Sequence, residues 1–433
     1  MSSLRSDNNP VLSPSALNRF LGCEYRTYLD LLEKRGELDA ERRPPRLQLL
    51  LEQGQRHEDE ILEGLRSEGR DIAEIPDDRP VKERAALTLE AMRAGRGVVY
   101  QACLAHENWI GYPDFLIRID EPSKDWPWSY EIHDAKLASA ARPDHIFQLL
   151  FYADALEAIQ GSRPQQMYLL LGSGEEPAFD PGDFDAYAGG IRQLFVRRYG
   201  ELSDGAAPAY PYPVDACQFC PWWHVCDDKR RADDHLSLVA NLRRGQGLKL
   251  EASGVTTLPE VAALDADTVI PRLSRDTVAT LRAQADLQLR SRGLDRPLYD
   301  LLEPAHDRGL GRLPAPSLGD VHFDFEGDQT WGDEGLEYLF GTVYEEGGEL
   351  RYMPLWAFDR ATEKKALENW IDWLFARLET WPDLHVFHYN AYETTALKKL
   401  VARHATRELE LDELLKRKVF VDLYGITRQA LRA

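Results

Sequence analysis

Two acidic residues and a lysine stand in the chain at a spacing that suits phosphodiester hydrolysis. Asp134 and Lys136 are two residues apart in WSYEIHDAKL, and Asp114 lies near the middle of WIGYPDFLIRI. Both segments have the alternating pattern of β-strands, so the side chains of Asp134 and Lys136 should face the same side. Two carboxylates can hold a divalent metal that acidifies a water molecule and neutralises phosphate charge, while a lysine positions the nucleophile. Taken alone, an Asp-x-Lys pair also fits an exposed ion pair.

Helices are expected on both sides of these strands. The pattern predicts an amphipathic helix over residues 45–68 and another that begins at Asp144. Helix, three antiparallel strands and helix make an α/β core. His57 lies on the first of these helices, where its imidazole can be a further metal ligand. Gln148 and Tyr152 are four residues apart on the second, so they share a face and can contact the scissile phosphate or the DNA backbone.

In chain order these segments read G-x-x-H-E, G-x-P-D, D-x-K and Q-x-x-x-Y. The ordered set resembles the RecB-like branch of the PD-(D/E)XK nuclease superfamily, which has a restriction-endonuclease-like α/β core. The resemblance implies a Mg²⁺ or Mn²⁺ site, a catalytic lysine and an auxiliary helical motif. The corresponding residues are His57, Asp114 and Asp134 for the metal, Lys136 for the lysine, and Gln148 and Tyr152 for the auxiliary motif.

Cysteines form a second group. The chain contains a C-x2-C-x5-C triplet made of Cys217, Cys220 and Cys226. Three thiolates leave a four-coordinate site one ligand short, and a zinc site is consistent with the ligand count. Cys23 is the available fourth ligand, and we expect it just inside a helix predicted over residues 13–35. Cys103, in the predicted strand YQACLA, is interpreted as an ordinary buried cysteine.

The cysteine pattern resembles that of iron–sulfur members of the RecB-like group, which include helicase-associated and CRISPR-associated exonucleases. These have one cysteine before the nuclease core and three after it. The resemblance implies a 4Fe–4S cluster, with Zn²⁺ as the alternative, on Cys23, Cys217, Cys220 and Cys226. Such a cluster would tie the two ends of the nuclease domain together. Trp222, Trp223 and His224 would shield it by packing, or stack on bases.

A third group of acids lies near the C-terminus. HFDFEGD places Asp324 and Glu326 two apart on a predicted strand, and HYNAYETTALKKL carries Asn390 and Glu393 where a strand meets a helix. Carboxylates from separate elements can hold paired metals that drive exonucleolytic hydrolysis. Residues 320–349 contain ten acids and no Lys or Arg, so some of these acids can also be plain surface charge.

This half resembles the ribonuclease-H-like exonuclease fold of the DEDD type, in its YprB-like form, with a D-x-E first motif. By that resemblance Asp324, Glu326 and Glu393 are ligands of a second metal site, and Asp422 has an accessory position. Glu393 stands where many relatives have Asp. The family's last acidic residue lies on a further helix, and the chain ends at Ala433 before it, so this domain is expected to be incomplete.

The composition is that of a globular protein. Hydrophobic residues make up 43% and charged residues 29%, which excludes a mainly disordered chain. No apolar run approaches a membrane span and the polar start is not a signal peptide, so a cytoplasmic location is expected. Five cysteines are too few for a disulfide scaffold. A net charge of −21 argues against a non-specific nucleic-acid coat, and DNA binding should be poor without divalent cations.

These observations predict an α/β protein in three parts. Residues 1–230 would form the nuclease domain with its four-cysteine cluster, residues 231–310 a helical, helix-hairpin-like connector, and residues 318–433 the ribonuclease-H-like domain. This architecture resembles a family of RecB-like nucleases whose longer relatives continue into a superfamily 1 helicase, which implies a helicase as a partner. The chain itself has no G-x-x-x-x-G-K-[ST] loop and therefore no sign of an ATP-driven motor.

The expected function is a metal-dependent DNA exonuclease that acts on single-stranded or end-containing DNA in repair or recombination. Two alternatives stay open from the sequence. One is an RNA exonuclease that uses the C-terminal domain. The other is a non-catalytic nucleic-acid-binding protein, in which the C-terminal domain is a scaffold.

Overall fold

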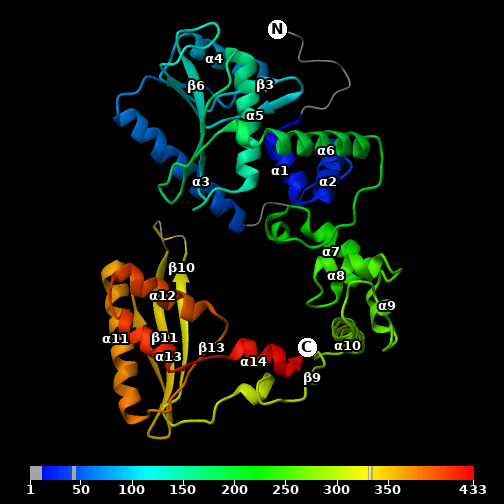
Figure 1. Ribbon diagram of the computed structural model, residues 1–433, viewed down its shortest axis with the longest axis vertical. Helices are drawn as coiled ribbons and strands as arrows, with labels where there is room; N and C mark the ends of the chain where they lie inside the picture. The colour runs from blue at the N-terminus through cyan, green and yellow to red at the C-terminus, as the bar shows by residue number, and fades with distance from the viewer. Residues whose placement is uncertain (1–11, 41–44, 330, 333–334) are drawn as a thin grey trace. The chain divides into compact units, whose positions relative to one another are not determined.

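The chain is described from a computed structural model, which covers residues 12–40, 45–329, 331–332 and 335–433. It divides into two compact units, residues 1–237 and residues 238–433 (Figure 1). Of the segment 231–310 that the sequence predicts as a connector, residues from 238 onward fall in the second unit. The polar start of the sequence, which we interpret as no signal peptide, lies outside the described residues. None of the described helices is long and apolar enough to cross a membrane.

A mixed sheet forms the centre of the first unit. The described residues give it the strand order β1-β2-β5-β6-β7-β8. These strands are β1 Ile72–Glu74, β2 Val98–Tyr100, β5 Phe115–Ile119, β6 Ser129–Lys136, β7 Met167–Leu171 and β8 Ala178–Phe179. The three predicted strands pair antiparallel, β2 with β5 and β5 with β6, as expected. Strand β7, which the sequence analysis does not include, then pairs parallel with β6.

Helices pack on both faces of this sheet (Figure 1). Helix α3 (Pro45–Ser67) covers one face, where Leu62 packs with Phe115 and Leu170. The opposite face carries the larger core, to which α5 (Pro143–Gln160) contributes most. Helices α1 (Pro14–Gly22), α2 (Glu24–Lys34) and α6 (Asp185–Ser203) complete that side. The helices predicted over residues 45–68 and from Asp144 are thus confirmed.

Three predictions of continuous elements are wrong, and two of them are the segments broken next to Pro113 and at Cys23. The segment 109–119 is not one strand: β4 (Trp109–Gly111) ends, and β5 begins at Phe115. Pro113 lies in the gap and has no N–H to give to a ladder, so Asp114 sits at the start of β5 and not in mid-strand. The helix predicted over residues 13–35 is likewise two helices, because Cys23 has an extended backbone with φ −165°.

Further short elements frame the first unit. Helix α4 (Val81–Arg93) follows β1, and β3 (Leu104–His106) pairs with β4. The segment YQACLA is split in the same way as 109–119, since Gln101 has a φ of 53° between β2 and β3. In the cysteine triplet, Cys217 lies on a 3-10 helix, η2 (Asp215–Phe219), Cys220 directly follows it, and Cys226 lies on α7 (Trp223–Ala232).

The second unit begins with the predicted short helices. These are α8 (Arg244–Glu251), α9 (Leu258–Ala262) and α10 (Arg275–Ser291). Thr257 and Glu260 form a capping box at the start of α9, and Ser274 caps α10, so the sequence fixes where both helices begin. Residues 300–313 follow, with the short strand β9 (Asp300–Leu301) and the 3-10 helix η4 (Gly309–Arg312).

The rest of the second unit is a sheet with helices on one face. Within the described residues the strand order is β12-β11-β10-β13-β14. The strands are β10 Val321–Asp328, β11 Leu336–Glu346, β12 Glu349–Trp356, β13 Val386–His388 and β14 Phe420–Asp422. Helices α11 (Arg360–Thr380), α12 (Tyr392–His404) and α13 (Glu408–Lys416) pack on the sheet, and α14 (Leu423–Ala430) follows β14. Phe323 and Phe325 face Trp370 and the core, which leaves Asp324 and Glu326 on the opposite, open face as predicted.

Candidate active sites

Asp134 and Lys136 form the centre of the first site. Both lie on β6 and face the side of the sheet that α5 covers, and their side chains form an ion pair. The Asp134 side chain is fully buried, whereas the Lys136 side chain is 21% exposed. Among the described residues, Asp134 Oδ1 has no hydrogen-bond partner. A buried carboxylate oxygen without a donor is costly, and a cation is the partner that would suit it.

Asp114 joins this pair from the start of β5. Its Oδ2 accepts a hydrogen bond from the backbone N–H of Ala135, 2.8 Å away, so its carboxylate lies beside the Asp134–Lys136 pair. Burial, followed by the charge of Asp134, raises the pKa of Asp114 well above its usual range. Burial opposes the charged form of Lys136, but Asp134 and Asp114 outweigh it and raise the pKa of the lysine. Two acids and a protonated lysine therefore converge where the sequence predicts them.

Tyr152 holds the loop that leads to Asp114. Its hydroxyl donates to the carbonyl oxygen of Tyr112 at 3.0 Å and accepts from Gln148 Nε2 at 2.7 Å. Tyr152 is only 2% exposed, and burial together with the charge of Asp134 raises its pKa. The structure thus places Tyr152 as a support for the Asp114 loop. Gln148, which is half-buried, is the member of the pair that a ligand can reach.

His57 was predicted as a metal ligand with Asp114 and Asp134, but its imidazole contacts the backbone of β7 instead. Its Nε2 lies 3.0 Å from the carbonyl oxygen of Leu170 on β7. The adjacent Glu58 instead accepts a hydrogen bond from Gln101, and its charge raises the pKa of both Asp114 and Lys136. Successive helical side chains project about 100° apart, which separates the two. Glu58 was missed from the sequence, although it is the last letter of the G-x-x-H-E motif.

His145 is a second residue that the motifs did not single out. It lies on α5 three residues before Gln148, is 6% exposed, and its Nδ1 has no hydrogen-bond partner among the described residues. Burial lowers its pKa, as does the charge of Lys136, which shows that the imidazole lies near the site. Only the i, i+3 spacing to Gln148 could have indicated it.

The four predicted cysteine ligands surround one cavity. Cys23 comes from the break between α1 and α2, Cys217 from η2, Cys220 from the position after η2, and Cys226 from α7. Together they line a cavity of about 200 Å³. All four are free thiols. Burial and the neighbouring thiols raise the pKa of Cys226 to about 12. Arg26 and Arg230 also line the cavity, so cations face the sulfur atoms. The structure brings the set together across almost the full length of the first unit.

Trp222 closes this cavity from within the triplet. It is fully buried, and its Nε1 donates to Asp30 Oδ1 on α2 at 2.8 Å. Trp223, by contrast, is 48% exposed. Cys103 lies elsewhere, buried beneath α4, and burial raises its pKa to about 11. The predicted division between four cavity cysteines and one core cysteine therefore agrees with their positions.

The C-terminal acids form the second site. Asp324 and Glu326 line a pocket of about 360 Å³ on the open face of β10, together with Tyr352 and Tyr389. Glu393, at the start of α12, is 3% exposed. Burial, and then a hydrogen bond with Glu393, raises the pKa of Asp324. Two carboxyl groups that share a proton in this way are close enough to share a cation instead.

Glu393 is held in place by the segment that joins β13 to α12. His388 Nδ1 lies 3.2 Å from Glu393 Oε2 and 2.6 Å from the carbonyl oxygen of Asn390. Both partners accept, so this ring nitrogen carries a proton. Asn390 has a φ of 80°, and its N–H donates to Asp422 Oδ1 at 2.9 Å. Asp422 therefore acts as a support for the loop, and His388 as a support for the acid.

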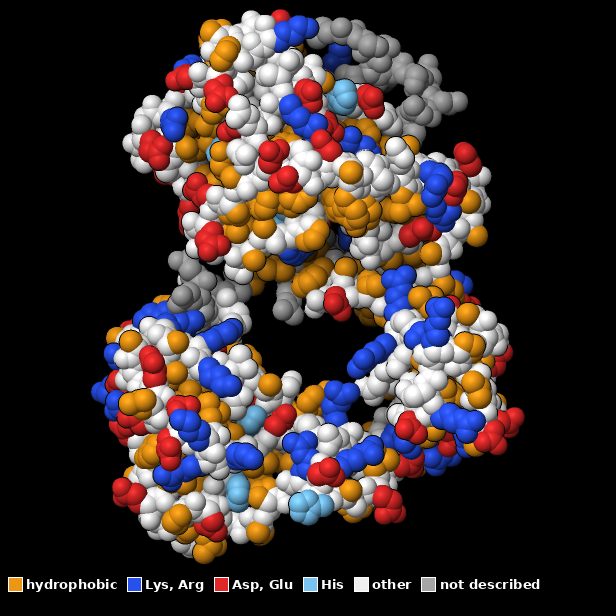
Figure 2. Space-filling view, viewed as in Figure 1, with side chains coloured by type: hydrophobic (Ala, Val, Ile, Leu, Met, Phe, Trp, Pro, Cys, Tyr) orange, Lys and Arg blue, Asp and Glu red, His pale blue; other side chains and the backbone are white. Residues whose placement is uncertain are grey.

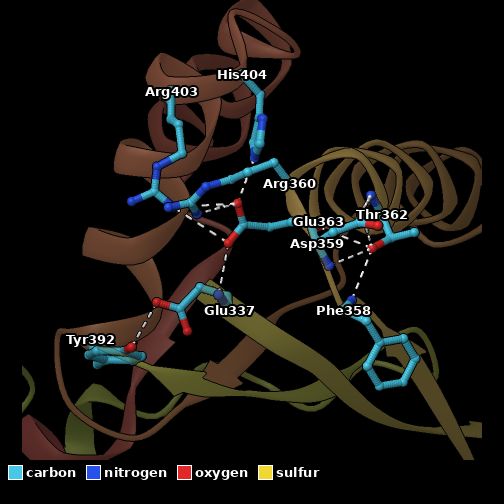
Figure 3. Close-up of polar contacts among 9 residues, drawn as sticks. All are labelled: Glu337, Phe358, Asp359, Arg360, Thr362, Glu363, Tyr392, Arg403 and His404. Carbon is cyan, nitrogen blue, oxygen red and sulfur yellow. Dashed lines mark hydrogen bonds and ion pairs between the residues drawn. The ribbon is translucent and has the colours of Figure 1, made fainter. Parts of the chain in front are cut away.

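A buried carboxylate anchors the other end of α12 (Figure 3). Glu363, on α11, is fully buried and accepts from the backbone N–H of Glu337 at 2.8 Å. His404 Nε2 lies 2.8 Å from its Oε2, and Arg360 and Arg403 also contact it. Figure 3 shows these side chains converging from α11, α12 and β11. Since Arg403 and His404 end the helix that Glu393 begins, Glu363 helps to fix α12 over the sheet.

Glu337 links this anchor to the acidic pocket. Tyr392 donates a hydrogen bond to Glu337 Oε1 at 2.8 Å (Figure 3). Burial raises the pKa of Glu337 and of Tyr392. A Cβ on Gly327 would lie 2.2 Å from Glu337 Oε2, so a larger residue at this point of β10 would displace the Glu337 carboxylate. As the side chains stand, no three His, Cys, Asp or Glu groups in the described ranges are close enough to hold a metal ion.

The first unit is a mixed α/β sheet that presents two acids and a lysine, and the second unit holds another α/β sheet with its own acids, an arrangement that suits a nuclease. Comparison with family models agrees. Residues 11–227 match PDDEXK_1 of the PD-(D/E)XK nuclease superfamily, and residues 321–432 match RNase_H_2 of the RNase H superfamily. The first match covers half of the chain, and the chain belongs to the PD-(D/E)XK nuclease superfamily. Comparison with curated proteins gives no match.

These matches confirm the predicted fusion and the mixed α/β fold class. The protein is a nuclease, that is, a hydrolase with a nucleic-acid substrate. Divalent metals are typical of both superfamilies. The iron–sulfur cluster, the individual site residues and the three domain boundaries stay predictions.

Proposed function

We propose that this protein is a divalent-metal-dependent DNA exonuclease whose first unit hydrolyses single-stranded or end-containing DNA. The observation that carries the proposal is the meeting of Asp114, Asp134 and Lys136 at one end of β5 and β6. Lys136 and Asp114 are partly exposed and can reach a bound strand, whereas Asp134 is buried behind them. A role in DNA repair or recombination, alone or beside a helicase, belongs to the same proposal.

The residues of this site suit a Mg²⁺ or Mn²⁺ ion. Asp134 Oδ1 lacks a donor among the described residues, and the pKa of Asp114 is raised by burial and by the second carboxylate beside it. Asp114 and Asp134 would hold the ion, with His57 or Glu58 from α3 as a third ligand. A divalent ion there would acidify a water molecule and neutralise charge on the phosphate.

Side chains of the site would position the attacking water and the phosphate. The Lys136 ammonium would orient the attacking water and stabilise negative charge that develops on the phosphate oxygens. Gln148 would donate its amide N–H to a phosphate oxygen of the bound strand. Tyr152 would keep the Asp114 loop in position through the carbonyl of Tyr112, without touching the substrate.

The substrate assay compares linear single-stranded DNA, covalently closed single-stranded DNA and linear RNA of one sequence, each in Mn²⁺. We expect loss of the linear DNA from an end while the closed circle survives. Cutting of the circle would make the enzyme an endonuclease. Degradation of RNA alone would favour the second candidate below.

The second candidate is an RNA exonuclease that uses the C-terminal domain. Its support is the contact between Asp324 and Glu393 beside a 360 Å³ pocket, within a domain that matches the RNase H superfamily. Asp324, Glu326 and Glu393 would hold the metal there. RNA degradation that survives Lys136→Ala and is lost in Asp324→Asn would establish this activity.

We also propose that Cys23, Cys217, Cys220 and Cys226 hold a 4Fe–4S cluster, with Zn²⁺ as the alternative. Four free thiols around a 200 Å³ cavity support a thiolate-bound group. Anaerobically purified protein should be brown, and Cys226→Ser should lose the colour whereas the control Cys103→Ser keeps it. A colourless protein with one zinc per chain would decide for zinc.

A further inference from the structure

A set of cations on the α8–α10 segment is not paired with acids. The set consists of Lys249, Arg272, Arg275 and Arg282, which we call the basic ridge. In the described part of the chain none of the four forms an ion pair. Arg290, two turns further along α10, does pair, with Asp286 and Asp300. In a chain of net charge −21, four unpaired cations on one short segment indicate a binding site for a negatively charged partner.

The basic ridge is continuous along α10 and the turn before it. Lys249 Nζ donates to the carbonyl oxygen of Arg272 at 3.0 Å, which ties α8 to this turn. Arg275 is the first residue of α10, and Arg282 follows seven residues later. Seven residues are two helical turns, so the two lie on one flank of the helix about 10 Å apart. Asp276 projects about 100° around the helix from Arg275 and does not interrupt the flank.

The backbone in the middle of the basic ridge is strained. Arg272 has a φ of 64°, a left-handed conformation that costs a non-glycine residue on the order of 1 kcal/mol. The Lys249 hydrogen bond to its carbonyl holds it there. Arg272 and Arg275 are both exposed. The chain therefore keeps an arginine in an unfavourable conformation where its side chain stands in solvent.

We propose that the basic ridge binds the phosphodiester backbone of the nucleic-acid strand that the protein cleaves, a proposal that rests on the nuclease function above. Guanidinium groups recognise phosphate through forked hydrogen bonds, and neighbouring cations that form no ion pair of their own can bind a polyanion. Figure 2 shows Lys and Arg side chains over the segment that Figure 1 labels α8 and α10. The acidic parts of the surface would repel DNA, so these cations would favour docking at the α8–α10 segment.

The test measures how salt affects binding of a labelled single-stranded oligonucleotide by anisotropy. EDTA is present, so that no metal bridges the protein and the phosphates. The four ridge residues are changed together to Gln. The control changes four lysines of the same unit that form no ion pair with the residues described in the structure, with the same loss of charge: Lys364→Gln, Lys365→Gln, Lys398→Gln and Lys399→Gln.

Four lost phosphate contacts should reduce the slope of log K against log salt by about 3 for a single strand. We expect that reduction in the ridge variant and a change below about 1 in the control. Equal slopes in wild type and ridge variant would overturn the proposal and leave the ridge to another acidic partner. Equal reductions of the slope in the ridge and control variants would also overturn it, because the binding would then depend on total charge and not on the ridge. Cleavage by the wild type in Mn²⁺ is assayed separately: if it fails, the nuclease proposal is at fault and not the ridge.

Discussion

Asp114 should destabilise the metal-free protein, and its replacement by Asn should show this directly. Its carboxylate lies beside that of Asp134 in a buried site, and burial and this like charge raise its pKa well above the usual range. Asn keeps the oxygen that accepts from the Ala135 N–H, 2.8 Å away, but has no charge. The substitution therefore removes the repulsion and leaves the fold of the loop unchanged.

The size of the effect follows from the two carboxylates. Unit charges about 4 Å apart interact by about 4 kcal/mol at an effective dielectric constant of about 20. Lys136 offsets part of this, since it forms an ion pair with Asp134. We expect Asp114→Asn to stabilise the first unit by about 1–2 kcal/mol without metal, within the range seen when buried charges are replaced. For a domain of this size that is a rise in Tm of about 2–8 °C.

The assay is thermal unfolding of the first unit in EDTA at neutral pH, followed by repetition in saturating Mg²⁺. The control is Asp125→Asn, an exposed acid outside the site, which should change Tm little. Ligand at about 100 times its Kd stabilises a folded protein by about 2.7 kcal/mol. Wild type should gain this from Mg²⁺ and the Asp114→Asn variant should not, so that the order of the two Tm values reverses.

The pH dependence has a defined sign. A carboxyl whose folded pKa lies above its unfolded value, about 3.9 for Asp, binds its proton more tightly when folded. Its contribution to stability is present below the unfolded pKa and is lost as pH rises through the raised folded pKa. Metal-free wild type should therefore lose stability relative to Asp114→Asn as pH rises. A variant that melts below wild type in EDTA at neutral pH would refute this reasoning.

Two further predictions concern the C-terminal unit. Glu363→Ala leaves buried donors without their acceptor and should lower the free energy of unfolding, measured in urea titrations, by about 3–5 kcal/mol. The control Glu379→Ala changes an exposed residue and should change this free energy by less than about 0.5 kcal/mol. Similar losses in both variants would contradict the role of Glu363 as an anchor. In a Lys136→Ala background, His388→Leu should abolish RNA cleavage by this unit. His388→Asn should retain part of the cleavage, because its amide can still donate a hydrogen bond to Glu393. Equal loss of cleavage in both variants would show that the hydrogen bond to Glu393 is not the contribution of His388.

Local pattern was sufficient for the parts of the sites that lie on regular elements. Alternation along a strand put Asp134 and Lys136 on one face, and did the same for Asp324 and Glu326, because side chains repeat every second residue. It failed where the chain leaves the regular element. Pro113 interrupts the strand before Asp114, so the acid reaches the site from a strand start.

Side-chain orientations that depend on contacts between residues distant in sequence could not be predicted from the sequence. The bond from Tyr152 to the Tyr112 carbonyl spans 40 residues, and the neighbouring side chains of His57 and Glu58 are directed by partners on β7 and next to β2. The extended backbone at Cys23 is similar: it separates one helix from the next, and it places the thiol at a cavity shared with a triplet that is distant in sequence. Such features can be identified only when the three-dimensional packing of the core is known.

The central claim is that Asp114, Asp134 and Lys136 cleave DNA. The most direct measurement is the rate at which wild type and Lys136→Ala degrade end-labelled single-stranded DNA in Mn²⁺, with Asp134→Ala beside them and the folded state of each checked by its melting curve. Loss of a group that stabilises transition-state charge typically costs about 100-fold or more in rate. We predict that wild type degrades the DNA and that both variants lose at least that much. Variants that cut as fast as wild type would contradict the assignment.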